Sequence, residues 1–104
     1  MQNITKEEWK KLVVEKDNAV VIDVRTSDEC EKGMQPNAIQ IDFMLLVSFL
    51  HEIDTLDRSK TYFLYCRTGN RSAQACMYMH DYGFKTYNLI GGMSSWDGDV
   101  VISK

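Results

Sequence analysis

The 104-residue sequence has few cysteines and few histidines, and this shortage excludes most metal and disulfide proteins. The three cysteines, Cys30, Cys66 and Cys76, form no C-x-x-C pair and no zinc-ligand spacing, and neither His51 nor His80 has a cysteine at such a spacing. We therefore expect no metal site and no cofactor. An odd number of cysteines without a disulfide framework is typical of a reducing compartment, so we expect a cytoplasmic protein.

An excess of basic residues and a long apolar run are also missing. Lys and Arg number 12 against 15 Asp and Glu, a net charge of −3, whereas nucleic-acid binding requires a basic surface. No stretch approaches the roughly 18 consecutive apolar residues of a membrane span. Residues 1–9 show no signal-peptide pattern of charged and then apolar residues. We therefore expect neither a nucleic acid nor a membrane as partner.

What the sequence does contain is an alternation of apolar strands and helices, without repeats, low-complexity runs or linkers. The chain is short enough to form one domain over residues 1–104. Residues 19–24 are apolar apart from Asp23 and do not alternate, as in a parallel strand that is covered on both faces, and residues 62–65 form a second such run. The pattern predicts an α/β fold with a central parallel sheet.

Caps and composition predict the remaining elements. Thr5 and Glu8 form a capping box before a helix over residues 6–15, in which Trp9 is the expected core anchor. Residues 43–53 are too apolar for an exposed helix, so we expect them to pack under the sheet rather than to form a partner surface. The other predicted elements are a helix over residues 28–32 capped by Ser27, a strand over 38–41, a helix over 72–82, a strand over 85–89 and a final helix that begins at Ser94–Trp96.

The loop between the strand at residues 62–65 and the next helix carries the chemistry. Cys66 ends the strand, and sites in open α/β sheets form beyond the carboxyl ends of strands. A loop that enters a helix turns free N–H groups inward, and the helix dipole favours negative charge there. Arg67 and Arg71 add positive charge, and no acid intervenes before Ser72. We therefore predict that Cys66 ionises more readily than a free cysteine, whose pKa is about 8.5.

The other two cysteines and one polar pair are given structural roles. Cys76 lies within a predicted helix among small and apolar residues and is expected to be a buried hydrophobe, and Cys30 is expected to be inert as well. Asp23 and Arg25 interrupt the apolar strand at its carboxyl end. They can fix the neighbouring loops or support the Cys66 loop, and we prefer the first role because charges at strand ends are common structural features.

Three motifs together resemble the rhodanese (sulfurtransferase) family. The family's active-site loop is similar to C-R-T-G-N-R-S, which begins at Cys66. Its first-strand signature is similar to V-V-I-D-V-R over residues 20–25, and its C-terminal signature is similar to L-I-G-G-M-S-S-W over residues 89–96. Residues 33–38, G-M-Q-P-N-A, depart from the family's Gly-His-Ile-Pro-Gly-Ala. The resemblance implies a three-layer α/β/α rhodanese-like domain with Cys66 as sulfur carrier and a substrate-binding cradle. That cradle comprises Arg67, Thr68, Gly69, Asn70, Arg71 and Ser72.

The resemblance also implies a reaction in two steps. The Cys66 thiolate takes the outer sulfur of a small anionic donor, thiosulfate or another persulfide, and a thiol or cyanide then removes it. A domain of this size leaves Cys66 near the surface, which suits a protein as acceptor. Arg71 can bind the donor or brace the loop through an ion pair, and the sequence leaves both roles open.

Two other functions compete with this reading. Cysteine phosphatases and arsenate reductases of related fold follow Cys-x5-Arg, but here the arginine comes one residue early, at Arg71, and Ser72 takes its place. The shorter loop disfavours a phosphate ester. A non-catalytic binding or regulatory module is the second alternative, although such modules often lack the cysteine that this chain retains.

Overall fold

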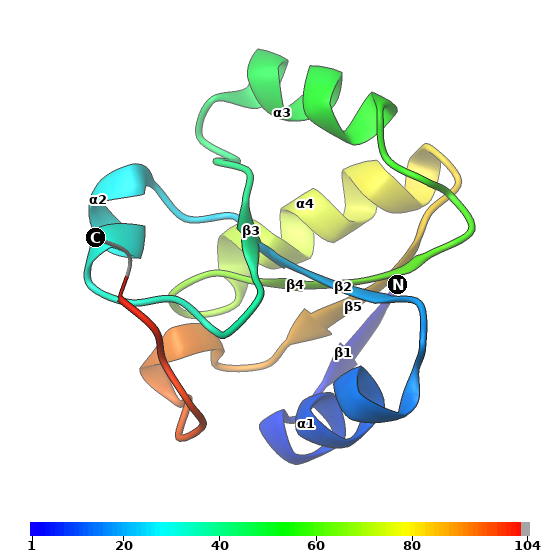
Figure 1. Cartoon of the computed structure of the whole chain (residues 1–104). Coiled ribbons are helices and arrows are strands. Elements are labelled where there is room, and N and C mark those ends of the chain that lie inside the picture. The colour runs from blue at the N-terminus through cyan, green and yellow to red at the C-terminus, as the bar shows by residue number, and fades with distance from the viewer. Residues whose placement is uncertain (103–104) are drawn as a thin grey trace.

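A parallel sheet of five strands forms the centre of the computed structural model, which describes residues 1–102 (Figure 1). The strand order is β1-β5-β4-β2-β3, and each neighbouring pair runs parallel. Ser103 and Lys104, which the predicted domain 1–104 includes, lie outside the described residues. The strands are β1 (Gln2–Ile4), β2 (Ala19–Asp23), β3 (Ile39–Gln40), β4 (Thr61–Tyr65) and β5 (Lys85–Leu89). The helices are α1 (Lys6–Glu15), α2 (Ser27–Glu31), α3 (Leu46–Asp54), α4 (Asn70–Asp81) and the 3-10 helix η1 (Gly92–Ser94).

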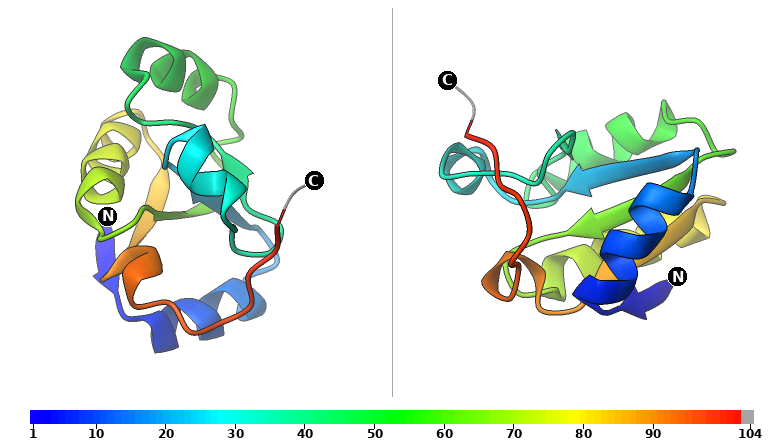
Figure 2. Two further views of the ribbon diagram at one scale, coloured as in Figure 1. Left: turned by 90° about the vertical axis from the view of Figure 1, so that its left-hand side faces the viewer. Right: turned by 60° about the horizontal axis from the view of Figure 1, so that its bottom comes forward.

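The sheet is covered on both faces, and the central strand shows how its side chains divide between them. Tyr62 and Leu64 of β4 pack into one apolar cluster with α3 and α4, while Phe63 and Tyr65 pack into a second cluster with α1. Trp9 anchors α1 in the second cluster, as predicted. Figures 1 and 2 show α3 and α4 on one side of the sheet and α1 on the other. The predicted three-layer α/β/α architecture is therefore confirmed.

The parallel register brings the ends of β2 and β4 together. Asp23, the last residue of β2, lies opposite Tyr65, the last residue of β4. Chain segments that leave these strands therefore start from the same edge of the sheet, where sites gather in open α/β folds. Cys66 is the first residue beyond β4 at this edge.

Several element boundaries differ from those predicted, three of them at caps and turns. Thr26, not Ser27, caps α2. Its side chain accepts a hydrogen bond from the Glu29 N–H in a capping box, and its extended backbone (φ −71°, ψ 162°) is the usual cap conformation. Helix α4 begins at Asn70, two residues early, because Gly69 turns the chain with φ 107°. The final helix is the 3-10 turn η1 rather than a helix from Ser94 to Trp96.

The expectation that residues 43–53 pack under the sheet holds for only one face of α3. Phe49 and Ile53 are fully buried, but the preceding apolar residues are exposed. A helix on the outside of a sheet buries one stripe, so the apolar residues off that stripe remain in contact with solvent. The exposed residues are Met44 (65%), Leu45 (60%), Leu46 (38%) and Val47 (73%).

Candidate active site

The loop after β4 folds back on the sulfur of Cys66. The Gly69 N–H donates a hydrogen bond to Cys66 Sγ at 3.1 Å, and the Ser72 hydroxyl donates a second at 3.3 Å. The turn requires glycine because φ at position 69 is 107°, and an added Cβ would lie 3.4 Å from the Leu89 carbonyl oxygen. The loop therefore presents hydrogen-bond donors to the sulfur.

These donors lower the pKa of Cys66. Burial is the largest influence and acts to raise the pKa, since Cys66 is only 1% exposed. The Ser72 hydroxyl, followed by the backbone N–H groups of Ser72, Gly69 and Thr68, outweighs it and brings the pKa below its ordinary value. The pKa shifts in the predicted direction. The expected position of the thiol near the surface was wrong, because the loop closes over it.

The pKa values of the other two cysteines shift in the opposite direction. Burial raises the pKa of Cys30 to about 12, and the nearby Asp23 carboxylate adds to the effect. Burial also raises the pKa of Cys76 to about 12. All three cysteines are free and buried. Of the three, Cys66 is the one whose hydrogen-bond donors outweigh burial and lower the pKa, so it is the candidate nucleophile.

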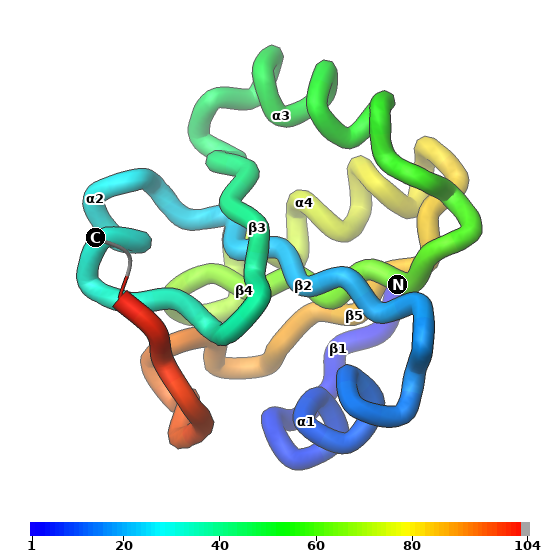
Figure 3. Tube along the Cα trace, viewed as in Figure 1, coloured from blue at the N-terminus to red at the C-terminus, as the bar shows by residue number. Residues whose placement is uncertain are grey.

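A second segment, whose contact with the loop was not predicted, holds the backbone of the loop. The N–H groups of Met93 and Ser94 donate to the carbonyls of Cys66 and Arg67, both at 2.9 Å, and the Ser94 hydroxyl donates to the Arg67 carbonyl at 2.7 Å. Figure 3 shows the orange tube around η1 beside the loop. With these carbonyls held on the η1 side, the N–H groups of the loop are free to face the sulfur.

The two glycines before Met93 were the signal that could have revealed this contact. A Cβ on Gly92 would lie 2.7 Å from the Arg67 carbonyl oxygen and closer still to that of Cys66. A glycine pair after a strand can mark such a close backbone approach. Asn88 is a further support: its side-chain amide donates to the Gly69 carbonyl at 3.2 Å and to Asn3 Oδ1 at 2.9 Å.

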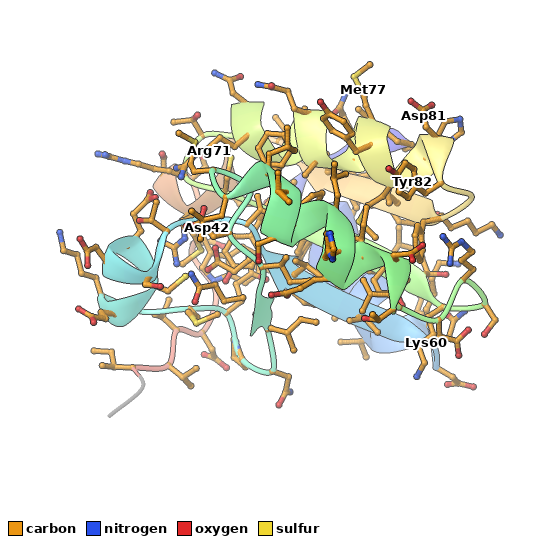
Figure 4. All side chains as sticks on the ribbon, turned by 90° about the horizontal axis from the view of Figure 1, so that it is seen from above. Asp42, Lys60, Arg71, Met77, Asp81 and Tyr82 are labelled. Carbon is orange, nitrogen blue, oxygen red and sulfur yellow. The ribbon has the colours of Figure 1, made fainter. Side chains whose placement is uncertain are left out.

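Arg71 braces the loop. Its guanidinium forms two hydrogen bonds with the Glu29 carboxylate, at 2.7 and 2.9 Å. Figure 4 labels Arg71 at the end of α4 that lies nearest α2. The Arg71 hydrogen bonds are the main cause that lowers the pKa of Glu29 to about 2. Of the two roles that the sequence left open, the structure shows the ion pair, which ties α4 to α2.

Asp23 and Arg25 form a buried ion pair at the end of β2. Arg25 Nη2 lies 2.8 Å from Asp23 Oδ2 and also donates to the Gly33 carbonyl at 2.7 Å. The Arg25 guanidinium lies over the Tyr65 ring, 5.7 Å from its centroid. Within residues 1–102, neither side chain hydrogen-bonds to residues 66–72. The pair fixes the loops that follow β2, which is the preferred structural role.

A shallow pocket of about 520 Å³ opens beside the loop. The predicted substrate residue Arg67 lines it, and Thr68 and Asn70 are also exposed. The pocket is lined by Arg25, Glu29, Lys32, Arg67, Met93 and Ser94.

No group of three or more His, Cys, Asp or Glu within residues 1–102 is placed to hold a metal ion. Over the same residues, no helix has the length and apolar character needed to cross a membrane.

The fold and the loop together define an α/β domain with a cysteine held at the carboxyl edge of a parallel sheet. The Rhodanese-like domain family matches residues 5–99, and the chain belongs to this family. YtwF of Bacillus subtilis, which carries a provisional sulfurtransferase name, is 40% identical over 80 residues, covering 77% of this chain and 75% of its own. A sulfurtransferase of Allochromatium vinosum is 31% identical over 97 residues, covering 92% of this chain and 88% of its own.

A solved structure supports the same assignment. The rhodanese-like domain protein of Staphylococcus aureus superposes with a TM-score of 0.87 at 30% identity, over 100% of both chains. The likeness therefore extends to the whole fold and is not confined to the Cys66 loop.

Proposed function

We propose that this protein is a sulfurtransferase in which Cys66 carries a sulfane sulfur as a persulfide. The observation that carries the proposal is the pair of donors on Cys66 Sγ, the Gly69 N–H and the Ser72 hydroxyl. A thiolate, not a thiol, is the nucleophile in such chemistry, and these donors lower the pKa of Cys66. The sulfurtransferase names of the relatives agree with this chemistry.

In the proposed first step, thiosulfate is the donor. The Cys66 thiolate attacks the outer sulfur, a bond forms between Sγ and that sulfur, and the S–S bond of thiosulfate breaks. Its electron pair leaves with sulfite, and Cys66 keeps the outer sulfur as a persulfide anion. The N–H groups of Thr68, Gly69 and Ser72 that lower the pKa of Cys66 then face the persulfide. Arg67, exposed at the pocket, attracts the anionic donor.

The second step transfers this sulfur to a thiol or, in an assay, to cyanide. No general base is needed to activate Cys66, because its donors already favour the thiolate. We further propose that the protein works in a reducing compartment such as the cytoplasm. The three free cysteines support this location, since an oxidising compartment would favour their pairing or oxidation.

The phosphatase alternative is less well supported. In the Cys-x5-Arg loop, the arginine follows at the sixth position after the cysteine, where this chain has Ser72. Arg71, one residue earlier, is already paired with Glu29. Neither residue therefore offers the free guanidinium that a phosphate ester would need.

Intact-protein mass after incubation with thiosulfate tests the proposal. We expect the wild type to gain one sulfur, about 32 Da, which cyanide then removes. Cys66→Ser should show no gain. Cys76→Ala is the matched control because it removes another buried cysteine, and it should gain the sulfur as the wild type does. A wild type that gains no sulfur from thiosulfate or from a small persulfide contradicts the proposal and favours a non-catalytic module.

A further inference from the structure

A buried side-chain amide on β5, that of Asn88, joins the Cys66 loop to the sheet. Its N–H groups donate to the Gly69 carbonyl at 3.2 Å and to Asn3 Oδ1 at 2.9 Å. We propose that Asn88 is a positioning residue: by holding the Gly69 carbonyl, it keeps the N–H of the same glycine aimed at Cys66 Sγ. This role rests on the proposed function, in which the Cys66 thiolate is the reacting group, and it names a residue that controls how readily the thiolate forms.

Gly69 is the residue of the loop that most needs an external restraint. Its φ of 107° favours glycine, and glycine is also the residue with the greatest backbone freedom. It is the N-cap of α4 and, lacking a side chain, forms no side-chain cap hydrogen bond. Its N–H nevertheless donates to Cys66 Sγ at 3.1 Å. The aim of this donor therefore depends on the contacts that other residues make with Gly69.

Two such contacts meet at the Gly69 carbonyl. The Ala73 N–H donates to it at 3.1 Å in the first turn of α4, and the Asn88 amide donates to it from the sheet. The bond from Ala73 fixes Gly69 relative to α4. The bond from Asn88 fixes it relative to β5, which pairs with β4, the strand that Cys66 follows. With both bonds in place, the Gly69 N–H is held in position relative to the sulfur.

The orientation of the Asn88 amide follows from its surroundings. The Gly69 carbonyl accepts hydrogen bonds and cannot donate one, so the nitrogen of the amide must face it. Asn88 is only 3% exposed, and its Oδ1 is left without a hydrogen-bond partner within residues 1–102. A buried acceptor without a partner is destabilising and calls for an explanation. The donors supply it, because an apolar side chain would avoid the unpaired oxygen but could not hold Gly69.

Asn3 holds the second N–H group of this amide. The two asparagines are register partners in the pairing of β1 with β5, so their side chains leave the sheet on the same face. Their hydrogen bond opposes rotation of the Asn88 amide away from Gly69. Strand β1 therefore takes part in positioning the loop.

Asn88→Leu tests the role, because leucine has a similar size and donates no hydrogen bond. The groups it leaves behind keep other partners, since the Gly69 carbonyl retains the Ala73 N–H and Asn3 is exposed to solvent. The variant also loses the unpaired Oδ1, so we expect it to be at least as stable as the wild type. Asn88→Ala removes the same donors without adding atoms and provides the same test if leucine does not fit.

Thr86→Val is the matched control. Thr86 is buried two residues earlier on β5, so it lies on the same face of the sheet as Asn88. Within residues 1–102 its hydroxyl makes no hydrogen bond to the Cys66 loop. The change to valine therefore also replaces a buried polar side chain by an apolar one of similar size. Melting temperatures establish that each variant folds.

The experiment measures two rates over a series of pH values. One is the rate at which iodoacetamide, an uncharged reagent, alkylates Cys66, followed by peptide mass, and the other is sulfur uptake from thiosulfate. We expect Asn88→Leu to raise the pKa of Cys66, because its thiolate loses a well-aimed donor. At neutral pH both rates should fall about fivefold, as expected from weakening one ordinary hydrogen bond. Above the pKa of Cys66 in both proteins the rates should converge, because both thiols are then ionised. Thr86→Val should follow the wild type throughout.

The other outcomes separate the positioning role from the proposed function. An unchanged pH profile in Asn88→Leu, with normal sulfur uptake by the wild type, overturns the positioning role and leaves the proposed function standing. A deficit that persists at high pH also overturns the role, since the change would then act on more than the ionisation of Cys66. A shift shared by Thr86→Val overturns it too, because any buried polar group on β5 would then have the same effect. A shifted alkylation profile in a protein whose wild type takes up no sulfur supports the positioning of Cys66 and overturns the proposed function.

Discussion

Cys66 and Cys76 are both buried, and their hydrogen-bond partners, not their exposure, separate them. Burial raises the pKa of Cys76 to about 12, whereas the donors around Cys66 outweigh burial and lower its pKa. A reactive cysteine in this fold is therefore made by the groups that point at its sulfur. Low exposure alone would have classed both as inert.

Ser72→Ala tests this conclusion. Removing the hydroxyl that donates to Cys66 Sγ should raise the pKa of Cys66, since a hydrogen bond to a charged group contributes about 1.5–3 kcal/mol. We expect the rate of alkylation by iodoacetamide at neutral pH to fall about tenfold or more. The measurement is the rate of alkylation as a function of pH. Ser48→Ala, exposed on α3, is the control, and an unchanged profile for Ser72→Ala would show that the backbone donors suffice.

The pairing of Glu29 with Arg71 predicts a loss of stability in acid. The pKa of Glu29 falls from 4.5 to about 2 in the folded protein, so its contribution is fully present above pH 4.5. It is lost as the pH falls from 4.5 towards 2, because the unfolded chain binds the proton first. Since the pair is partly exposed, we expect the contribution to be about 1–2 kcal/mol.

Denaturant unfolding across this pH range measures the effect. Glu29→Gln should lose less stability than the wild type as the pH falls, while Glu31→Gln, exposed on the same helix, should follow the wild type. Parallel curves for the wild type and Glu29→Gln would mean that the ion pair contributes nothing to folding.

At the scale of elements, η1 and the Cys66 loop form one unit. Gly92→Ala would push a methyl group into the Cys66 and Arg67 carbonyls, so we expect it to displace the loop and greatly reduce persulfide formation. Gly83→Ala is the matched control: its φ of 92° is also positive, but the nearest atoms to its Cβ lie 3.9 Å away, in the Arg58 side chain. Both variants should lose about 1 kcal/mol or more of stability from backbone strain.

The assay for this pair is mass gain from thiosulfate in folded protein. We expect Gly83→Ala to gain the sulfur and Gly92→Ala to gain little. Equal gains would show that the loop keeps its geometry without close packing against η1.

Local patterns predicted most of the elements but not the contacts between distant ones. The capping box at Thr5 and the apolar runs of β2 and β4 lie within short windows, and the predicted helix and strands are present. Strand β1 was missed because it has three residues and pairs only with β5, more than 80 residues away. No local pattern marks such a strand.

For the site, too, features within one short segment could be predicted, and contacts between distant segments could not. The loop sequence from Cys66 to Ser72 allowed the lowered pKa of Cys66 to be predicted, because the donors lie within the loop. The partner of Arg71 could not be predicted, since Glu29 lies 42 residues away. The supports from Met93 and Ser94 depend on the return of the chain after β5. The glycine pair before Met93 marks a close backbone approach, but the sequence does not say which segment is approached.

At the scale of the whole molecule, the charge around the pocket beside the Cys66 loop and the net charge of the chain have opposite signs. The chain carries −3, yet Lys32 and Arg67 line the pocket without partners among residues 1–102. Within the screening length of about 10 Å at 0.1 M salt, the nearby charges dominate. We therefore expect the rate of persulfide formation from thiosulfate to fall a few-fold as sodium chloride rises from about 0.05 to 0.5 M. A rate that rises with salt would mean that the net charge controls the approach of the donor.

The contacts of β5 and η1 with the Cys66 loop also bear on when the site forms during synthesis. A side-chain hydrogen bond between Asn3 and Asn88 joins β1 to β5, and Asn88 also donates to the Gly69 carbonyl. The N–H groups of Met93 and Ser94 donate to the carbonyls of Cys66 and Arg67. During synthesis the ribosome releases Cys66 well before it releases residues 88–94. The nascent chain therefore exposes this cysteine without its outer supports, and the nucleophile is fully assembled only after residues 88–94 have left the ribosome.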